Sequence, residues 1–183
     1  MLGLARGGVV VAAPIARRLR APLDVIVVRK LGLPWQPELA MGAIGSETAV
    51  VRNERVLRRG RVSTEDFDRV VTAERAELAR REAAYRGGRP PRSPTDQVVV
   101  VVDDGLATGA SARVALQEVR AAQPARLLLA VPVAPRGSAA DLADLADGVV
   151  VLAEPHPFGA VGQHYRDFTA TTDEEVRALL GVR

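Results

Sequence analysis

The chain has 183 residues, a net charge of +3 and no cysteine, and 48% of its residues are hydrophobic. This composition is typical of a folded globular protein, and the length fits one domain over residues 1–183. The lack of cysteine excludes disulfides, thiol nucleophiles and cysteine-ligated metals. Apolar runs such as Val98 to Val102 are far shorter than the roughly 20 residues that cross a bilayer. The N-terminus lacks the pattern of a signal peptide, so we expect a cytoplasmic protein with no membrane partner.

The positive charge comes almost entirely from arginine, because Lys30 is the only lysine. The arginines are interspersed with acidic residues along the chain and do not form the cluster that is typical of a nucleic-acid footprint. A compositional bias towards arginine therefore explains the charge better than a nucleic-acid partner, which is a weak alternative. The single lysine is a candidate for a specific role.

Short valine-rich segments that do not alternate with polar residues predict strands buried on both faces of a parallel sheet. After a short first strand at Leu2–Ala5, these strands are expected at Val25–Val28, Val98–Val102, Leu127–Val133 and Val149–Leu152. Helical patterns separate them, at Val9–Leu19, Ser111–Ala121 and Ala139–Ala146. The repeated order of strand and helix predicts an α/β fold with a mostly parallel sheet flanked by helices.

The middle of the chain departs from this order. Met41–Gly45 and Thr48–Val51 predict the two strands of a hairpin. A long polar helix is expected from Ser63, which can cap its N-terminus, to near Arg86, before two glycines and two prolines. Its apolar positions form a narrow stripe, so this helical insertion, at about residues 63–86, is expected to lie against the domain with most of its surface solvated.

The segment from Val98 to Ser111, VVVVVDDGLATGAS, has the pattern of a buried strand, a polar turn and the start of a helix. Ligands of open α/β sheets lie beyond the carboxyl ends of the strands, and the free N–H groups of the following helix favour an anion there. Gly109 allows the backbone to approach this anion, and Thr108 and Ser111 can donate hydrogen bonds to it. The pattern therefore indicates a phosphate site.

Two adjacent acids, Asp103 and Asp104, follow the strand directly. Carboxylates at this position can accept hydrogen bonds from neighbouring sugar hydroxyls or hold a divalent cation through water. A phosphate site beside a site for a sugar diol indicates a ribose phosphate. The segment is not a nucleoside-triphosphate P-loop because no lysine follows Gly109, and the sequence has no GxGxxG dinucleotide motif. The alternative is a surface turn whose polar residues only cap the helix.

This segment resembles the 5-phosphoribosyl-1-diphosphate signature of the type I phosphoribosyltransferases. The resemblance implies a phosphoribosyltransferase-type, Rossmann-like fold with a small hood. It also implies transfer of 5-phosphoribosyl from 5-phosphoribosyl-1-diphosphate to a nitrogenous, nucleobase-like acceptor, with Mg²⁺ as cofactor and diphosphate as product. Asp103 and Asp104 would then be catalytic residues that contact the ribose and the metal. The 5-phosphate is assigned to Ala107, Thr108, Gly109, Ala110 and Ser111.

Two further segments resemble parts of the same family. Arg6, Gly7 and Gly8 resemble the diphosphate-binding loop, although a simple helix-entry turn is the alternative. Arg29 and Lys30 resemble the catalytic Arg-Lys pair of orotate and adenine phosphoribosyltransferases, in which a flexible loop closes over the diphosphate. The turn-forming residues that follow Lys30 predict such a loop. A solvated, cationic strand end is the alternative reading of the pair.

The tail at about residues 154–170 holds both histidines and three of the five Phe and Tyr residues. In related enzymes a hood near this end recognises the acceptor by stacking and hydrogen bonding, so Phe158, Tyr165 and Phe168 are acceptor-binding candidates. A loop that closes the sheet edge is the alternative. The histidines are eight residues apart without an HExxH motif, which argues against a zinc site.

Other questions stay open at this stage. The main alternative function is a non-catalytic protein that senses 5-phosphoribosyl-1-diphosphate and regulates a partner. Trp35, the only tryptophan, either covers the closed site or serves as a surface anchor or oligomer contact, and a homodimer is an open expectation. Related proteins carry a helix and a strand before the Arg-Gly-Gly loop, whereas five residues precede Arg6 here. We therefore expect a chain that is shortened at its N-terminus.

Overall fold

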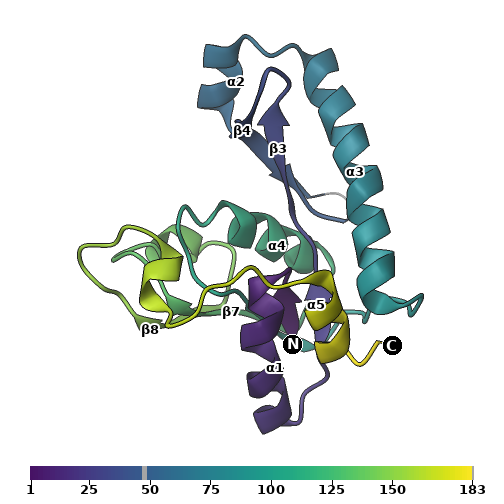
Figure 1. Ribbon diagram of the computed structural model, residues 1–183, viewed down its shortest axis with the longest axis vertical. Helices are drawn as coiled ribbons and strands as arrows, with labels where there is room; N and C mark the ends of the chain where they lie inside the picture. The colour runs from purple at the N-terminus through teal and green to yellow at the C-terminus, as the bar shows by residue number, and fades with distance from the viewer. Residues whose placement is uncertain (47–48, 183) are drawn as a thin grey trace.

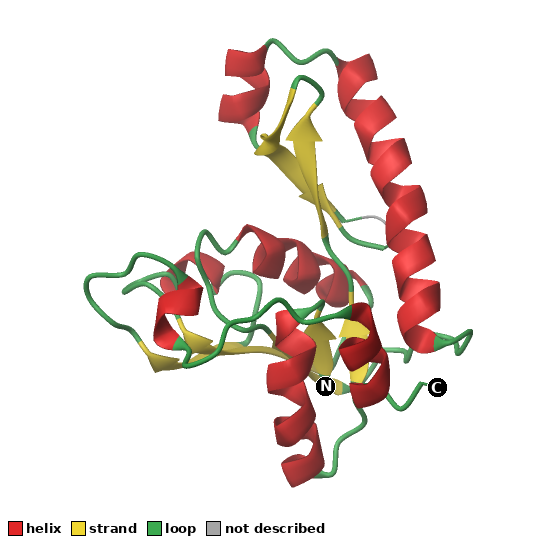
Figure 2. Ribbon diagram, viewed as in Figure 1, coloured by secondary structure: helices red, strands yellow, loops and turns green. Residues whose placement is uncertain are grey.

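The computed structural model describes residues 1–46 and 49–182 and contains two sheets (Figures 1 and 2). The parallel sheet has the order β2-β1-β6-β7-β8 and the antiparallel sheet the order β3-β4-β5. The strands are β1 (Leu2–Leu4), β2 (Asp24–Ile26), β3 (Arg29–Leu33), β4 (Gln36–Ile44), β5 (Val50–Arg52), β6 (Val98–Val102), β7 (Arg126–Val133) and β8 (Gly148–Ala153). The predicted α/β fold with a mostly parallel sheet is confirmed.

Helices lie on both faces of the parallel sheet, and α2 packs beside β4 of the antiparallel sheet. The helices are α1 (Gly7–Leu19), α2 (Glu54–Gly60), α3 (Thr64–Arg86), α4 (Ala110–Ala121) and α5 (Asp173–Leu179), with short 3₁₀ turns η1 (Ala140–Leu142) and η2 (Val161–His164). One buried cluster joins α4 to Leu4 and Ile26. A second cluster joins α1, α3 and α5 to Val25 and continues into the antiparallel sheet at Leu31. Within the described part of the chain, no helix is both long and apolar enough to cross a membrane.

The predicted strands all form, but β8 is not buried on both faces. Val150 is 51% exposed and Leu152 is 78% exposed, whereas Val149 and Val151 pack against the core cluster under α4. The exposed and packed side chains alternate along β8, so one face of this edge strand is covered by the core and the other face is not. An apolar run shows that a segment is a strand, but it does not show whether both of its faces are covered.

The predicted helix at Ala139–Ala146 is wrong, because only the short turn η1 forms there. Two arginines of α4 donate to backbone carbonyls of this segment, and the carbonyl of Asp141 is one that a regular helix would use for the amide of Leu145. Arg113 donates to the carbonyl of Asp141, and Arg120 donates to the carbonyl of Leu145 at 3.2 Å. Hydrogen bonds from α4 therefore outweigh the helix propensity of this segment.

The residues after Lys30 do not form the predicted loop. Instead, β3 and β4 pair as an antiparallel hairpin, with Lys30 opposite Ala43. Leu31 and Leu33 alternate along β3 and are buried against the cluster that includes α3, which explains why this segment is extended. The predicted hairpin corresponds to β4 and β5, and residues 47 and 48 between them lie outside the described residues.

The predicted insertion helix is confirmed as α3, and its ends have local causes. The side chain of Ser63 caps its first turn, and Gly87 ends it with a left-handed φ of 58°. Near its C-terminus, Arg86 donates to the carboxylate of Asp24 at 3.1 Å, and both side chains are nearly buried. This ion pair joins α3 to β2. Helices α2 and α5 were not predicted, although the Thr172–Glu175 capping box of α5 is visible in the sequence.

Replacing Asp24 with alanine is expected to lower the free energy of unfolding by about 3 kcal/mol, because Arg86 then keeps its charge in buried surroundings without its nearest carboxylate. Urea denaturation followed by circular dichroism measures the change. The control is Glu54→Gln, which breaks the exposed pair with Arg52 and is expected to cost less than about 1 kcal/mol. Equal losses for the two variants would contradict an anchoring role for the buried pair.

Candidate functional site

The candidate site lies where three neighbouring parallel strands end. β1 pairs with β2 on one side and with β6 on the other, so that Leu4 is opposite Ile26 and Gly3 is opposite Val102. The segments that follow these strands therefore leave the sheet at the same edge. This arrangement brings together the Arg6 loop, the Arg29-Lys30 pair and the Asp103-Asp104 turn, which are far apart in the sequence.

Two glycines allow α1 to approach the acidic turn. A Cβ on Gly8 would lie 2.4 Å from the carbonyl oxygen of Val102, and a Cβ on Gly7 would lie 2.0 Å from a carboxylate oxygen of Asp104. Any larger residue would push α1 away from β6. Close packing at the start of α1 thus explains the two glycines of the Arg-Gly-Gly sequence.

The acidic turn is tied to the C-terminal tail. The Tyr165 hydroxyl donates to the backbone carbonyl of Asp104 at 2.6 Å, and the amide of Asp104 donates to the Asp103 carboxylate at 2.9 Å. Burial and the neighbouring charge of Asp104 raise the pKa of Asp103 to about 7, whereas Lys30 acts to lower it. Burial also raises the pKa of Asp104. Both carboxylates are therefore poorly solvated and would gain from hydroxyl donors or a cation.

The segment after the acids forms an open helix N-terminus. The amide of Leu106 donates to the Val133 carbonyl at 2.9 Å, which holds the turn against β7. Gly109 has a φ of 69° and precedes α4 without a side-chain cap. The first amides of α4 have no intrahelical acceptors and are suited to an anion. A cavity of about 250 Å³ lies here, and its lining includes Lys30, both acids and all five predicted phosphate residues: Ala107, Thr108, Gly109, Ala110 and Ser111.

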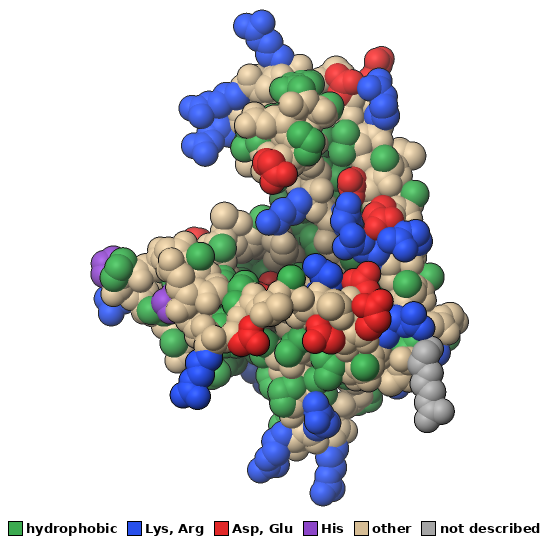
Figure 3. All heavy atoms as spheres, viewed as in Figure 1, with side chains coloured by type: hydrophobic (Ala, Val, Ile, Leu, Met, Phe, Trp, Pro, Cys, Tyr) green, Lys and Arg blue, Asp and Glu red, His purple; other side chains and the backbone are tan. Residues whose placement is uncertain are grey.

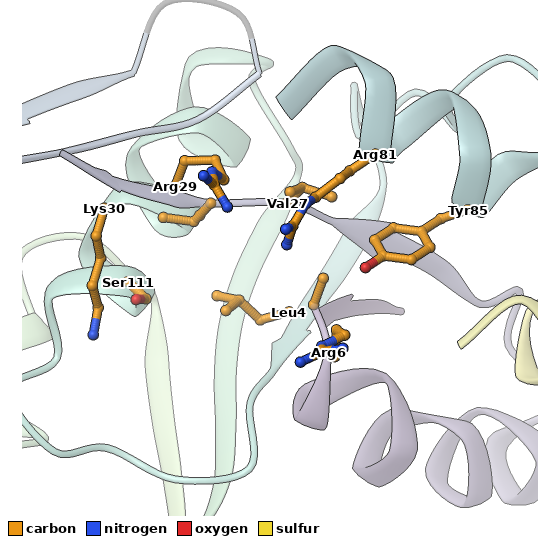
Figure 4. A pocket seen from close by; sticks show the side chains of 10 residues that line it. Leu4, Arg6, Val27, Arg29, Lys30, Arg81, Tyr85 and Ser111 are labelled. Carbon is orange, nitrogen blue, oxygen red and sulfur yellow. The ribbon is translucent and has the colours of Figure 1, made fainter. Parts of the chain in front are cut away.

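A second cavity, of about 340 Å³, adjoins the first at Lys30 and Ser111 (Figure 4). Its charged lining residues are Arg6, Arg29, Lys30 and Arg81, and among the described residues no carboxylate contributes to the lining. Figure 3 shows Lys and Arg side chains on both sides of the hollow between the parallel sheet and the portion that contains α3. Four converging cations make this cavity suited to a polyanion.

Acidic residues outside the cavity orient some of these cations. Glu74 accepts from Arg29, with the closest atoms 2.5 Å apart, and Asp173 lies 3.7 Å from Arg6. Asp173 also accepts a hydrogen bond from the hydroxyl of Tyr85 at 2.7 Å. Burial raises the pKa of Tyr85 to about 12, so its hydroxyl remains protonated.

A third cavity, of about 660 Å³, lies between the start of α1, the tail and α5. Tyr165 and Phe168 contribute to its lining, with ring centroids 5.2 Å apart, as do Arg6 and Asp104. Phe168 also lines the cavity at the start of α4. An apolar ring surface therefore lies beside the acidic turn.

Some predicted site residues lie elsewhere. Phe158 stacks on His164 at a centroid distance of 5.2 Å and lines none of the three cavities. Gly8 is buried beneath the Arg6 loop and contributes to packing, not to a cavity surface. Trp35 is 58% exposed in the β3–β4 turn, near Gly60 at the end of α2, so it does not cover the site. The short distance in sequence between Trp35 and Lys30 was misleading because the extended strand β3 places Lys30 at its start and Trp35 beyond its far end.

Two residues of α3, Arg81 and Tyr85, were not predicted to belong to the site. Tyr85 was assigned to the apolar stripe of the helix, and Arg81 was one of many charged residues on a helix expected to be solvated. The only signal in the sequence is the spacing of four residues between Glu77 and Arg81 and again between Arg81 and Tyr85, which puts the three on one face of the helix.

A metal would have few protein ligands here. Among the described residues, no group of three or more acidic or histidine side chains could hold an ion by itself. Mg²⁺, however, commonly uses one or two carboxylates together with substrate phosphates and water. Asp103 and Asp104, two poorly solvated carboxylates beside a polyanion cavity, fit this second arrangement.

Comparison with known proteins agrees with the geometry. Two Mycobacterium tuberculosis proteins, "Putative phosphoribosyl transferase MT0597" of strain CDC 1551 / Oshkosh and "Putative phosphoribosyl transferase Rv0571c" of strain H37Rv, are each 49% identical over 180 residues. The alignments cover 98% of this chain but 41% of each relative, so the chain spans about two fifths of the length of these curated relatives.

A solved structure extends the comparison. The crystal structure of TT1426 from Thermus thermophilus superimposes with a TM-score of 0.79 and 44% sequence identity, covering 98% of this chain and 85% of that one. The phosphoribosyl transferase domain family matches residues 1–162, which confirms the resemblance found in the sequence. This chain belongs to the phosphoribosyl transferase domain family.

Proposed function

We propose that this protein is a phosphoribosyltransferase that transfers 5-phosphoribosyl from 5-phosphoribosyl-1-diphosphate to a nitrogenous, nucleobase-like acceptor and releases diphosphate. One observation carries the proposal. The cavity at the start of α4, which Asp103 and Asp104 also line, meets the cavity with four cations at Lys30 and Ser111. A ligand with a phosphate at one end and a diphosphate at the other fits this order of charges.

Each part of the donor has a matching group in this arrangement. The 5-phosphate would bind the open N-terminus of α4 and the hydroxyls of Thr108 and Ser111. The ribose hydroxyls would donate to Asp103 and Asp104, whose pKa values are raised mainly by burial. The diphosphate would then extend from ribose C1 into the cavity of four cations.

The reaction needs charge stabilisation more than covalent chemistry. A nitrogen of the acceptor attacks ribose C1 as the bond from C1 to the diphosphate oxygen breaks, and the electron pair of that bond leaves with the diphosphate. The cations stabilise the growing negative charge, and the two aspartates stabilise the positive charge that develops on the ribose. Mg²⁺, when bound with the donor at Asp103 and Asp104, would supply further neutralisation of the diphosphate.

The third cavity is the best candidate for the acceptor. It borders Asp104 and Arg6, so an aromatic base bound there would lie next to the ribose. The ring of Phe168 offers a stacking surface, as was expected from the sequence. The hydroxyl of Tyr165 is already bonded to the acidic turn, so this residue would mainly hold the turn in place.

The double substitution of Asp103 and Asp104 by asparagine is expected to reduce kcat/KM by about 10²–10³-fold, because charge stabilisation at the ribose is lost. Diphosphate release from 5-phosphoribosyl-1-diphosphate, with Mg²⁺ and a panel of purine and pyrimidine bases, is the measurement. Asp68→Asn, on the exposed face of α3, is the control and should retain full activity.

Two results would contradict this proposal. If the double variant turned over the donor as fast as the control, the role given to the aspartates would be wrong. If the wild-type protein bound 5-phosphoribosyl-1-diphosphate but released no diphosphate with any base, transfer would be excluded for those acceptors and the sensor hypothesis would be favoured.

Phe168→Ala is expected to raise the acceptor KM by roughly tenfold, because stacking of a base on an aromatic ring contributes about 1–3 kcal/mol. The KM for 5-phosphoribosyl-1-diphosphate should change less than about twofold, because Phe168 borders the cavity at the start of α4 but has no polar group to bind a phosphate or a ribose hydroxyl. Phe158→Ala is the matched control, because this ring lies outside the three cavities. An acceptor KM that rises equally in both variants would show that Phe168 acts only through folding of the tail.

A further inference from the structure

The cation cavity includes one charged residue that the sequence did not assign to a ligand. Arg81 comes from α3, whereas Arg6, Arg29 and Lys30 come from segments at the ends of β1 and β2. In Figure 4 the guanidinium groups of Arg29 and Arg81 enter the cavity from one side, and Arg6 lies opposite them. The inserted helix therefore adds a fourth positive charge to the cavity.

The charge on Arg81 is only partly balanced within the protein. Its Nε donates to Glu77 at 2.8 Å, but Arg80 donates to both oxygens of the same carboxylate, at 2.7 and 2.9 Å. The Glu77 carboxylate thus accepts hydrogen bonds from two guanidinium groups. Because Glu77 contacts Arg81 through Nε, the terminal nitrogens of Arg81 are directed towards the cavity (Figure 4).

Arg81 is also held in place. Its side chain is 34% exposed, whereas that of Arg80 is 63% exposed. Tyr85, one turn further along α3, is buried and bonded to Asp173, and Arg86 is paired with Asp24. A cation fixed in this way binds an anion with a smaller loss of side-chain entropy than a free surface arginine.

We propose that Arg81 of α3 binds the diphosphate group of the donor, through charge-assisted hydrogen bonds from its terminal nitrogens. The proposal rests on the proposed function, because that function places a diphosphate in this cavity. It extends the site to the helical insertion, which thereby contributes a ligand-binding residue in addition to its packing role. Arg81 does not line the cavity at the start of α4, where the ribose 5-phosphate portion would bind.

The adjacent arginine provides a matched control. Arg81→Gln and Arg80→Gln each remove one guanidinium group from Glu77 on the same helix, but only Arg81 lines the cavity. Calorimetry would measure three probes with Mg²⁺: inorganic diphosphate, 5-phosphoribosyl-1-diphosphate and ribose 5-phosphate. Arg81→Gln is expected to lower the affinity for inorganic diphosphate and for 5-phosphoribosyl-1-diphosphate by about tenfold to a hundredfold, as for a lost hydrogen bond to a charged group. Ribose 5-phosphate binding should change less than about twofold, and Arg80→Gln should leave all three unchanged.

The possible results separate this inference from the proposed function. If Arg81→Gln and Arg80→Gln gave equal affinities, or if Arg81→Gln weakened ribose 5-phosphate as much as diphosphate, Arg81 would not be a diphosphate ligand. If the wild-type protein bound inorganic diphosphate but not 5-phosphoribosyl-1-diphosphate, the proposed function would be wrong. The diphosphate affinities of the Arg81 and Arg80 variants would then still show whether Arg81 is a diphosphate ligand. Binding of none of the probes by the wild-type protein would overturn both.

A second pair of variants covers the case in which the glutamine variant does not fold. Arg81→Lys keeps the charge but loses the planar fork of donors, and Arg80→Lys is its control. A loss of about threefold or more in diphosphate affinity for the Arg81 variant alone supports the inference. Unchanged affinity in both lysine variants, with a thermal melting temperature like that of the wild type, contradicts a directed guanidinium contact.

Discussion

The site depends on the pairing of β1 with both β2 and β6. These parallel ladders place three strand ends at one edge of the sheet, and each end continues into a segment with different chemistry. The short strand β1 can occupy this central place because Gly3 and Gly8 allow α1 to pack within van der Waals distance of the neighbouring backbone. Side chains at these positions would separate the Arg6 loop from the acidic turn. The position of the site follows from strand order, and its compactness follows from the glycines.

Among the described residues, the two acids of the site do not line the cavity that holds its four cations. The acidic turn is poorly solvated, with the pKa of Asp103 raised to about 7, whereas the adjoining cavity is lined by four cations. Glu74 and Glu77, both on α3, orient two of these cations from outside the cavity. The acids of α3 thus limit the mutual repulsion of the arginines without adding a competing carboxylate to the described lining of the cavity. Such fixed charges need little rearrangement when a polyanion binds.

The sequence predicted the parts of the fold and site that have local causes. The strand, acids and helix start at Val98–Ser111 form one continuous segment, so their pattern was sufficient. The packing of β3 against α3, the short turn η1 and the exposed face of β8 depend on how distant segments lie, so composition alone misled the prediction. Arg81 was missed for the same reason, because its role depends on how α3 lies against β2 and β3. Phe158 and Phe168 looked equivalent in the sequence, and only the path of the tail separates them.

Helix α3 links the stability of the fold to the shape of the site. The buried pair between Asp24 and Arg86 fixes the end of the helix against β2, whose chain continues to the cations Arg29 and Lys30. Tyr85 and Arg81 lie one and five residues before Arg86, so the same contact sets their position at the cavity. A helix held only at a distant point would allow Arg81 to move by several ångströms, and the geometry of its hydrogen bonds would be lost. The insertion is therefore anchored close to the residues that it contributes to the site.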